Sequence, residues 1–279
     1  KLCNVDLSKW DAHGFSVTRR KTGFGWNARF SKKKQSEATL EAVAAAFQES
    51  AAKHAPKKWD CEKVVSKERD CLYVLNCHDV HFGKLAYPAE CGGKAWDTKI
   101  ADSTFRSTID ELMGKAPQHR IEEVLLIVGS DMMQVDNNES TTTSGTYVDS
   151  DSRLAKVFDV TANAVTDVIE KLASRFKVRA LMIPGNHDDT MSFMLGRYVE
   201  AWFRTHPNVV VDSSPRSRKY YGYGKTLIGF DHGSETKLND LPLILMRENQ
   251  ETISKYQYQE FLVGHTHRES VNDIKGVKI

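Results

Sequence analysis

Residues 181–189 read LMIPGNHDD, and this stretch decides the fold that we expect for the chain. The apolar residues before Pro184-Gly185 are typical of a short buried strand. Asn186, His187 and Asp188 follow at once, and each carries an oxygen or nitrogen atom that can bind a metal ion. The stretch therefore predicts a buried strand that ends in a functional site.

Four more segments show the same arrangement of a β-rich run followed by polar residues. They are CLYVLNC (71–77), EVLLIVG (123–129), TLIGF (226–230) and EFLVG (260–264). Candidate helices lie between the five runs, and the clearest of them is residues 152–176. This alternation predicts an α/β domain in which helices cover the faces of the sheets.

Each of the five predicted strands ends in residues that can bind a metal ion. The five ends are His78-Asp79-Val80-His81, Gly129-Ser130-Asp131, Gly185-Asn186-His187-Asp188, Asp231-His232-Gly233 and Gly264-His265-Thr266-His267. Because the loops at the carboxyl ends of strands converge on one edge of an open α/β sheet, we expect roughly seven oxygen and imidazole donors in one pocket. The glycines allow the backbone to turn sharply there.

This donor set indicates hydrolysis at phosphorus. Carboxylate, amide and imidazole donors fit divalent ions, of which manganese is expected here, with iron or zinc as alternatives. Two ions bridged by an Asp hold a hydroxide that attacks phosphorus in line. His187 is the candidate proton donor to the leaving oxygen, with Asp188 to orient it. A lone histidine at a strand end is more often a core or surface residue, and Gly-Asn alone is a common turn pair, but five such ends in series favour the metal site.

The series D-x-H, G-x-D, G-N-H-D, H-G and G-H-T-H resembles the motifs of the calcineurin-like metallophosphoesterase superfamily over about residues 70–270. The resemblance implies two packed mixed β-sheets flanked by helices and a pair of divalent metal ions. It also implies His187 as the catalytic proton donor or transition-state stabiliser, supported by Asp188. For the ions it implies one set of ligands from Asp79, His81 and His267, a second from Asn186, His232 and His265, and Asp131 as the bridge.

One position departs from the family pattern. Ser130 stands between the glycine and Asp131, where the second motif of the family is usually Gly-Asp. Asp136 in the segment QVDN is therefore the alternative bridging residue. His78 is interpreted either as a structural residue or as one that supports the ligands from outside the metal shell, rather than as a ligand itself, and Asp189 is assigned no role.

The first motif continues as D-V-H-F-G-K, which is similar to the start of the nuclease subunits of double-strand-break repair complexes. The G-D-x-x-D-R-G and G-N-H-E forms of the protein phosphatases are absent from the sequence, which disfavours protein dephosphorylation. The segments TTTSGTYVDSDSR and HGSETKLNDLP are similar to phosphoesterases encoded by phages and prophages. The repair nucleases carry a cap after the core, whereas this chain ends soon after G-H-T-H. We therefore expect either that the front of the chain grips the substrate or that the chain is truncated.

Three functions are compatible with these motifs. The leading hypothesis is a metal-dependent DNA nuclease, which the D-V-H-F-G-K motif and a basic front module favour. The second is a phosphodiesterase for cyclic nucleotides or other small phosphoesters, because relatives of that kind share D-x-H and G-N-H-D, and metal ions contact only the phosphate. The third is a non-catalytic nucleic-acid-binding scaffold, which is disfavoured because each expected ligand type and His187 are present.

Residues 1–66 are predicted to form a basic accessory module, and residues 67–279 the catalytic domain. Within the module we expect a β-hairpin over 15–34 and a helix over 36–54. Residues 1–70 carry 15 Lys/Arg against 9 Asp/Glu, a balance that suits either a phosphate-bearing partner such as DNA or a solvated lysine-rich surface. The hairpin aromatics either stack on bases or, more commonly, pack against the helix. The segment 137–152 is expected to be a long polar loop that either has a functional role, such as lining the pocket, or is mobile.

The cysteine content and the lengths of the apolar stretches indicate the cellular compartment and the partners. The chain has five cysteines and no C-x-x-C pair, which predicts reduced thiols in an intracellular, cytoplasmic setting. No stretch approaches the ~20 apolar residues that span a bilayer, and no signal-peptide pattern opens the chain, so no membrane partner is expected. Relatives of the repair nucleases are often homodimers, but no heptad or apolar patch in this sequence demands one.

Overall fold

The computed structural model describes residues 10–20, 23–32, 40–59, 61, 71–116 and 120–279, with side chains described from residue 41 onward. The chain divides into two compact units, residues 1–43 and residues 44–279. Each unit is described by itself.

The smaller unit contains an antiparallel hairpin. Its strands are β1 (Trp10–Arg20) and β2 (Gly23–Lys32), and Arg20 pairs with Gly23 at the turn. A hairpin was predicted over residues 15–34, and the observed strands extend that prediction toward the N-terminus. The predicted packing of its aromatic residues concerns side chains outside the described part of the chain, so it stays a prediction.

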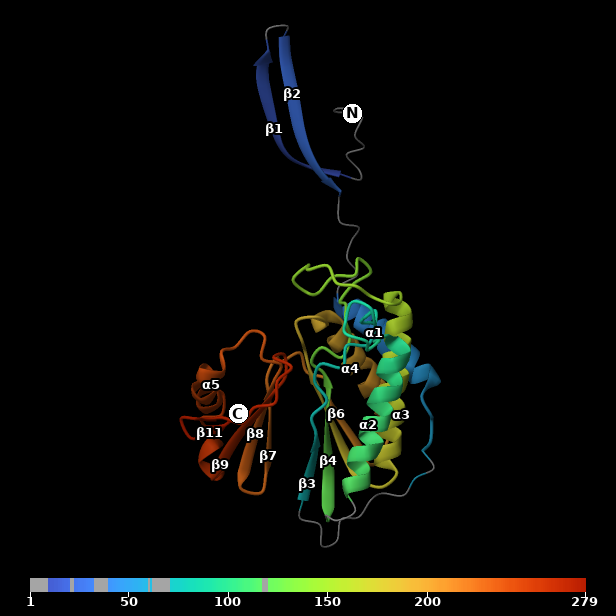
Figure 1. Cartoon of the computed structure of the whole chain (residues 1–279), viewed down its shortest axis with the longest axis vertical. Helices are drawn as coiled ribbons and strands as arrows, with labels where there is room; N and C mark the ends of the chain where they lie inside the picture. Colours follow the sequence, from blue (N-terminus) through green and yellow to red (C-terminus); the bar gives the residue numbers. More distant parts are fainter. Residues whose placement is uncertain (1–9, 21–22, 33–39, 60, 62–70, 117–119) are drawn as a thin grey trace. The chain divides into compact units, whose positions relative to one another are not determined.

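The larger unit contains two β-sheets (Figure 1). The first has four strands, all parallel, in the order β3 (Cys71–Leu75), β4 (Ile121–Gly129), β5 (Lys177–Ile183) and β6 (Val209–Asp212). The second has five strands in mixed directions, in the order β10 (Asp273–Ile274), β11 (Val277–Lys278), β9 (Tyr258–Val263), β8 (Thr226–Asp231) and β7 (Lys219–Tyr223). All five strands predicted from the sequence are present, and β8 and β9 run parallel to each other.

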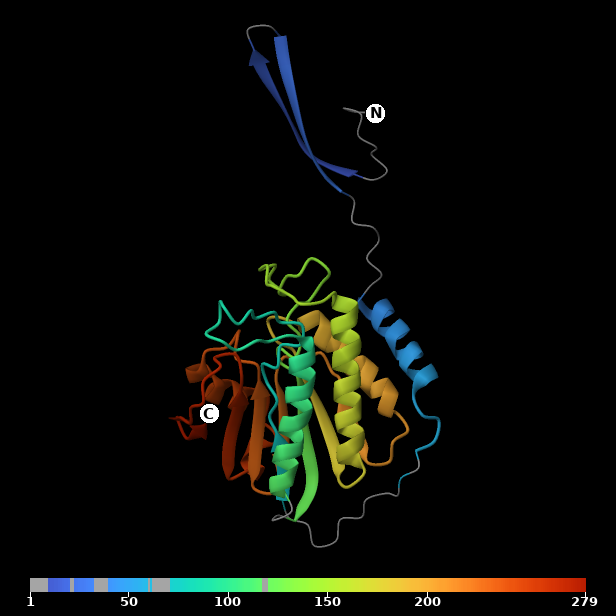
Figure 2. The ribbon, with the colours of Figure 1, turned by 45° about the vertical axis from the view of Figure 1, so that its right-hand side comes forward.

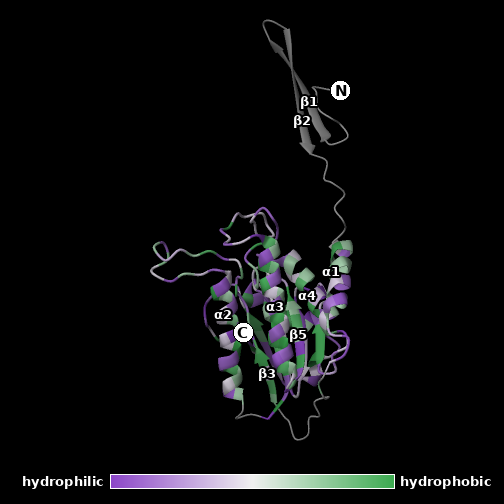
Figure 3. Cartoon of the chain, turned by 90° about the vertical axis from the view of Figure 1, so that its right-hand side faces the viewer, coloured by the Kyte–Doolittle hydropathy of each residue, from purple (hydrophilic) through white to green (hydrophobic). Residues whose placement is uncertain are grey.

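The two sheets pack face to face. Successive side chains of a strand point to opposite faces, so each inner strand contributes alternate residues to the layer between the sheets. This layer consists of Leu125, Ile127, Leu181, Ile183, Ile228 and Phe230. Figure 3 shows the hydrophobic strands between helices whose surfaces are partly hydrophilic.

Helices cover both outer faces. On the parallel sheet lie α2 (Thr98–Lys115), α3 (Leu154–Ala173) and α4 (Asp189–Phe203), as Figures 1 and 2 show. On the mixed sheet lies α5 (Leu241–Glu248), whose Leu241 and Leu245 pack with Phe261. Two short 3-10 turns, Leu238–Asp240 and Ile253–Lys255, flank α5. The predicted fold class, two packed sheets flanked by helices, is confirmed, with the refinement that one sheet is wholly parallel.

Helix α1 (Leu40–His54) packs against the larger unit, although the sequence placed it in the accessory module. Its Phe47 ring lies 5.0 Å from the ring of Phe158 in α3. The Ala52 carbonyl accepts a hydrogen bond of 3.3 Å from Arg204. The chain therefore divides at residue 43 rather than at residue 66, because the apolar face of α1 is buried against helices that lie far along the sequence.

No helix in the described part of the chain is both long and apolar enough to cross a membrane.

The stability of the fold should depend strongly on the side chains that are buried between the two sheets. Leu125 is fully buried there, so Leu125→Ala is expected to lower the free energy of unfolding by about 2–5 kcal/mol. Urea unfolding followed by circular dichroism measures this change. Leu243 of α5 is 68% exposed, so Leu243→Ala is the control and should change stability by less than about 0.5 kcal/mol. Equal effects of the two substitutions would contradict the packing described.

Candidate metal centre

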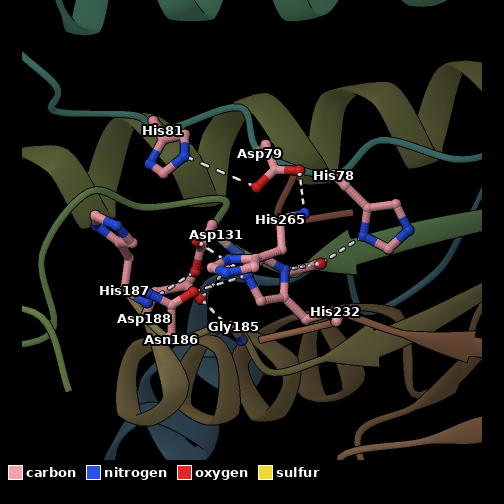
Figure 4. A network of polar contacts seen from close by, with 12 residues as sticks. His78, Asp79, His81, Asp131, Gly185, Asn186, His187, Asp188, His232 and His265 are labelled. Atoms are coloured by element: carbon pink, nitrogen blue, oxygen red, sulfur yellow. Dashed lines mark hydrogen bonds and ion pairs between the residues drawn. The ribbon is translucent and has the colours of Figure 1, made fainter. Parts of the chain in front are cut away.

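Five strand ends meet at one edge of the larger unit. The loops that leave β3, β4, β5, β8 and β9 bring all seven predicted metal ligands together with His187. Figure 4 shows most of these side chains pointing toward one another from separate elements. Parallel strands end at the same edge, so their loops are neighbours in space although they are far apart in the sequence.

Three groups of side chains place their donor atoms within 4.8 Å of one another. The groups are Asp79, His81 and His267; His81, Asp131 and His187; and Asp131, His232 and His265. The first and third correspond to the two ligand sets that the motifs imply. Asn186 joins the third group, because its Oδ1 lies 2.9 Å from His232 Nε2.

Asp131 occupies the centre of the arrangement. It is 1% exposed and belongs to two of the three groups. Its Oδ2 lies 3.1 Å from His232 Nε2, and its Oδ1 accepts a 2.8 Å hydrogen bond from the His187 backbone N–H. Burial alone would raise the pKa of Asp131, but His232 and the His187 N–H lower it. Burial likewise opposes the charged form of His232, yet Asp131 raises the pKa of that histidine.

The alternative bridging residue, Asp136, has a different place. Its Oδ1 accepts from the Met191 backbone N–H at 2.9 Å, and its Oδ2 accepts from the Thr143 hydroxyl at 3.0 Å. These contacts tie the first turn of α4 to the polar loop. Asp136 belongs to none of the donor groups found among the described residues, so Asp131 is the only one of the two that lies between the ligand sets.

Three candidate metal-binding atoms of the first group are buried without a hydrogen-bond partner among the described residues. Asp79 Oδ1 and both ring nitrogens of His81 have no hydrogen bond in the structure. Asp79 Oδ1 lies 3.2 Å from His267 Nε2 and 3.9 Å from His81 Nε2. Burial is the largest cause that lowers the pKa of His81 to about 3, so the ring is neutral and keeps a lone pair. Buried polar atoms left unpaired cost roughly 1–3 kcal/mol each, and a divalent ion ligated by carboxylate and imidazole would satisfy them.

The backbone is strained at this edge. Among the described residues other than glycine, eight have a positive φ, and six of these lie in the candidate centre. Their φ angles are between +50° and +68°, and they are Asp79, His81, Ser130, Asp131, His265 and His267. This left-handed region is unfavourable for residues with a Cβ atom. Concentrated strain of this kind is typical of functional sites, where it holds side chains in a required direction.

The prediction that Asp188 orients His187 is wrong. The His187 ring donates from Nδ1 to the Gln134 carbonyl oxygen at 2.9 Å. The wholly buried Asp188 carboxylate instead accepts from the backbone N–H groups of Asp131, Gly185 and Met133 at 2.9–3.2 Å. His187 and Asp188 are neighbours in the sequence just before α4, and their side chains contact different groups. Burial, and then the charge of Asp131, raise the pKa of Asp188 to about 7.

Ser130 belongs to the candidate centre, although the sequence analysis assigned it no role. Its Oγ lies 2.8 Å from His232 Nδ1 and also contacts His78 Nδ1. His78 therefore contacts a residue that in turn contacts His232, and it belongs to none of the donor groups found among the described residues. Burial lowers its pKa to about 3. The extra residue between Gly129 and Asp131 set this position apart in the sequence, but the contacts of the Ser130 hydroxyl could not be predicted from the sequence.

A cavity of about 420 Å³ opens beside the third donor group. Asn186 and His232 form part of its wall, and Thr143 and Ser144 of the predicted polar loop form another part. The Thr143 backbone N–H donates to the Asn186 carbonyl at 3.2 Å. The loop therefore lines the site, as expected. Asp189, which received no role from the sequence, also faces this cavity.

Comparison with known proteins finds no match to a family model, a curated protein sequence or a solved structure. The resemblance to the metallophosphoesterases therefore stays a prediction from the motifs.

Substitution of Gly185 tests whether the position of Asp131 depends on the absence of a side chain at residue 185. A Cβ atom at this position would lie within 3.0 Å of the Oδ1, Cγ and N atoms of Asp131, so Gly185→Ala should displace Asp131 and destabilise the fold by about 1–3 kcal/mol. Gly114 of α2 has no atom within 4 Å of such a Cβ, and Gly114→Ala should stabilise by about 0.5–1 kcal/mol. Thermal unfolding of both variants distinguishes them. A neutral Gly185→Ala would show that Asp131 is not confined.

Proposed function

We propose that this protein is a two-metal phosphodiesterase, with DNA as the leading substrate class. The observation that carries the proposal is Asp131, a buried carboxylate shared by two groups of metal donors. A carboxylate between two ligand sets is the arrangement that a bridged pair of divalent ions requires. The proposal agrees with the family that the motifs resemble.

The ligands divide between two ions. Asp79, His81 and His267 would hold one, and Asn186, His232 and His265 the other, with Asp131 in common. Divalent ions such as Mn²⁺ supply Lewis acidity at the phosphoryl oxygens and activate water for attack on phosphorus. The positive φ angles of five of these residues, Asp79, His81, Asp131, His265 and His267, support the proposal, because a fixed backbone would hold the donors in place for the ions.

His187 is the proposed proton donor. Because its Nδ1 donates to the Gln134 carbonyl, the ring direction is set and Nε2 is left for the substrate. The ring centroid lies 4.8 Å from that of His81, so it stands beside the metal ligands. In its charged form, His187 would give the Nε2 proton to the departing oxygen, which removes the cost of expelling an alkoxide.

Two substrate classes remain under this mechanism. The basic balance of residues 1–70 and the D-V-H-F-G-K motif favour DNA. The cavity of about 420 Å³ beside Asn186 and His232 favours a small phosphodiester, because its volume lies within the range of small-molecule sites. Cys61, Cys77 and Cys91 form no disulfide with the described residues, which suits the proposed cytoplasmic location.

The first test is hydrolysis by metal-stripped protein before and after addition of Mn²⁺. We expect manganese-dependent cleavage of bis(p-nitrophenyl) phosphate and of end-labelled DNA, and a loss of at least about 100-fold in Asp131→Asn because the shared ligand is weakened. Cleavage of the chromogenic ester with intact DNA would favour the small substrate. No cleavage of either compound would count against an enzyme and favour the scaffold.

The role of His187 is tested separately from metal binding. His187→Gln should lower kcat for bis(p-nitrophenyl) phosphate by about 10²–10⁴-fold, while Mn²⁺ binding measured by calorimetry stays within about twofold. His54 is a histidine of α1 whose Nδ1 contacts the Ser50 carbonyl, so His54→Gln is the matched control with unchanged kcat. An unchanged kcat in His187→Gln would remove this residue from the mechanism.

Substitution of Ser130 is expected to weaken the binding of one metal ion much more than that of the other. If His232 ligates through Nε2, its Nδ1 proton is donated to Ser130 Oγ, and this hydroxyl donates to His78. Ser130→Ala should therefore weaken one Mn²⁺ by about 10–100-fold and leave the other nearly unchanged. Calorimetric titration resolves the two ions. Ser213→Ala is the control, because Ser213 is also buried but contacts Glu200 and Arg197. Equal weakening of both ions by Ser130→Ala would contradict the positioning role.

A further inference from the structure

The cavity beside Asn186 and His232 has an unusual wall for a protein that binds phosphate. Its lining residues include hydroxyl groups from Thr143, Ser144, Ser217 and Ser234 and carboxylates from Asp189, Asp231 and Glu235, and they include no Lys or Arg. Whatever occupies this cavity would lie directly against two of the candidate metal ligands.

The carboxylates of this wall differ in what they already bind. Asp231 accepts from the Gly233 backbone N–H at 2.6 Å and pairs with Arg218 at 3.4 Å. Asp189 and Glu235 also line the cavity, and neither has an ion pair with the described residues, so no basic side chain balances their charge there. A phosphate placed between them would be repelled by like charge. A sugar hydroxyl could instead donate hydrogen bonds to the same oxygens.

We infer that this cavity holds the uncharged, hydroxyl-bearing group next to the scissile phosphate, and that it excludes a second phosphate at that position. The inference rests on the proposed function and names the substrate class of the same site. The substrate would be a phosphodiester of a nucleoside or a similar sugar alcohol. In a DNA strand, only a terminal nucleoside with a free hydroxyl meets this condition, so cleavage would begin at hydroxyl ends rather than within the strand.

One neighbouring feature provides the opposing hypothesis. A second cavity of about 700 Å³ shares Pro215 and Ser217 with the first, and Arg216 lines it. Arg216 is exposed and makes no ion pair with the described residues, whereas Arg218 and Lys219 of the same wall are paired with carboxylates. If a second phosphate reached Arg216, a phosphate end would help binding instead of hindering it.

The test compares chromogenic nucleotides that differ by one phosphate. Thymidine 5′-(p-nitrophenyl phosphate) is offered with a free 3′-hydroxyl and with a 3′-phosphate, and the 3′-linked isomers are offered with a 5′-hydroxyl and a 5′-phosphate. In the manganese-loaded protein, we expect KM for the phosphorylated member of the better-hydrolysed pair to be about tenfold higher or more. Hydrolysis of bis(p-nitrophenyl) phosphate is followed in parallel.

Substitutions in the wall identify the cause. Glu235→Gln and Asp189→Asn should each reduce the KM ratio between phosphate and hydroxyl forms by several-fold, because each removes one repelling charge. Glu251 is exposed and lies outside the cavity, so Glu251→Gln should leave the ratio unchanged.

The possible results distinguish a failure of this inference from a failure of the proposed function on which it rests. Equal KM values for the two forms, or a ratio that Glu235→Gln and Asp189→Asn do not change, would overturn the inference while the phosphodiesterase stands. A preference for the phosphate form that Arg216→Ala abolishes would overturn it in favour of the neighbouring cavity. Failure to hydrolyse bis(p-nitrophenyl) phosphate would overturn the proposed function, and the inference with it.

Discussion

The contact between the inner faces of the two sheets is the interaction on which the rest of the structure depends. Three of the five strands that carry donors belong to the parallel sheet, and two belong to the mixed sheet. Neither sheet alone holds a complete set, because Asp131 and Asn186 follow β4 and β5 whereas His232 and His265 lie at the ends of β8 and β9. Burial of Ile127, Ile183, Phe230 and their neighbours places these ends within bonding distance of one another.

A buried carboxylate then joins the loops that leave the parallel sheet. Asp188 accepts hydrogen bonds from the backbone of Asp131, Met133 and Gly185. Burying such a group is costly unless its oxygens are satisfied, and three N–H donors satisfy them here. Gly185 allows Asp131 to approach the loop closely. The backbone of Asp131, whose φ is positive, is therefore held by contacts with residues outside the predicted ligand set.

The centre and its surroundings differ in electrostatic character. His81, Asp131 and His232 are buried donors, and Ser130 links His232 to His78. The adjacent cavity has hydroxyl and carboxylate walls without a basic residue among those that line it. Attraction of a phosphate would thus come from the metal ions, whereas the cavity would select what the phosphate is attached to. Under the proposed function, recognition of the ester and recognition of its alcohol would be physically separate.

The five strands that end in metal-capable residues and the α/β class could be predicted from the sequence, because strand composition, turn residues and side-chain type are local properties of the chain. The packing of the two sheets was needed to bring the predicted ligands together, to place Asp131 rather than Asp136 between the two predicted sets, and to assign residues 44–54 of α1 to the larger unit. The role of Asp188 was missed for the same reason. Its partners Asp131 and Met133 lie 57 and 55 residues away, and the direction of a buried side chain depends on the packing of two sheets and α4, which no local pattern records.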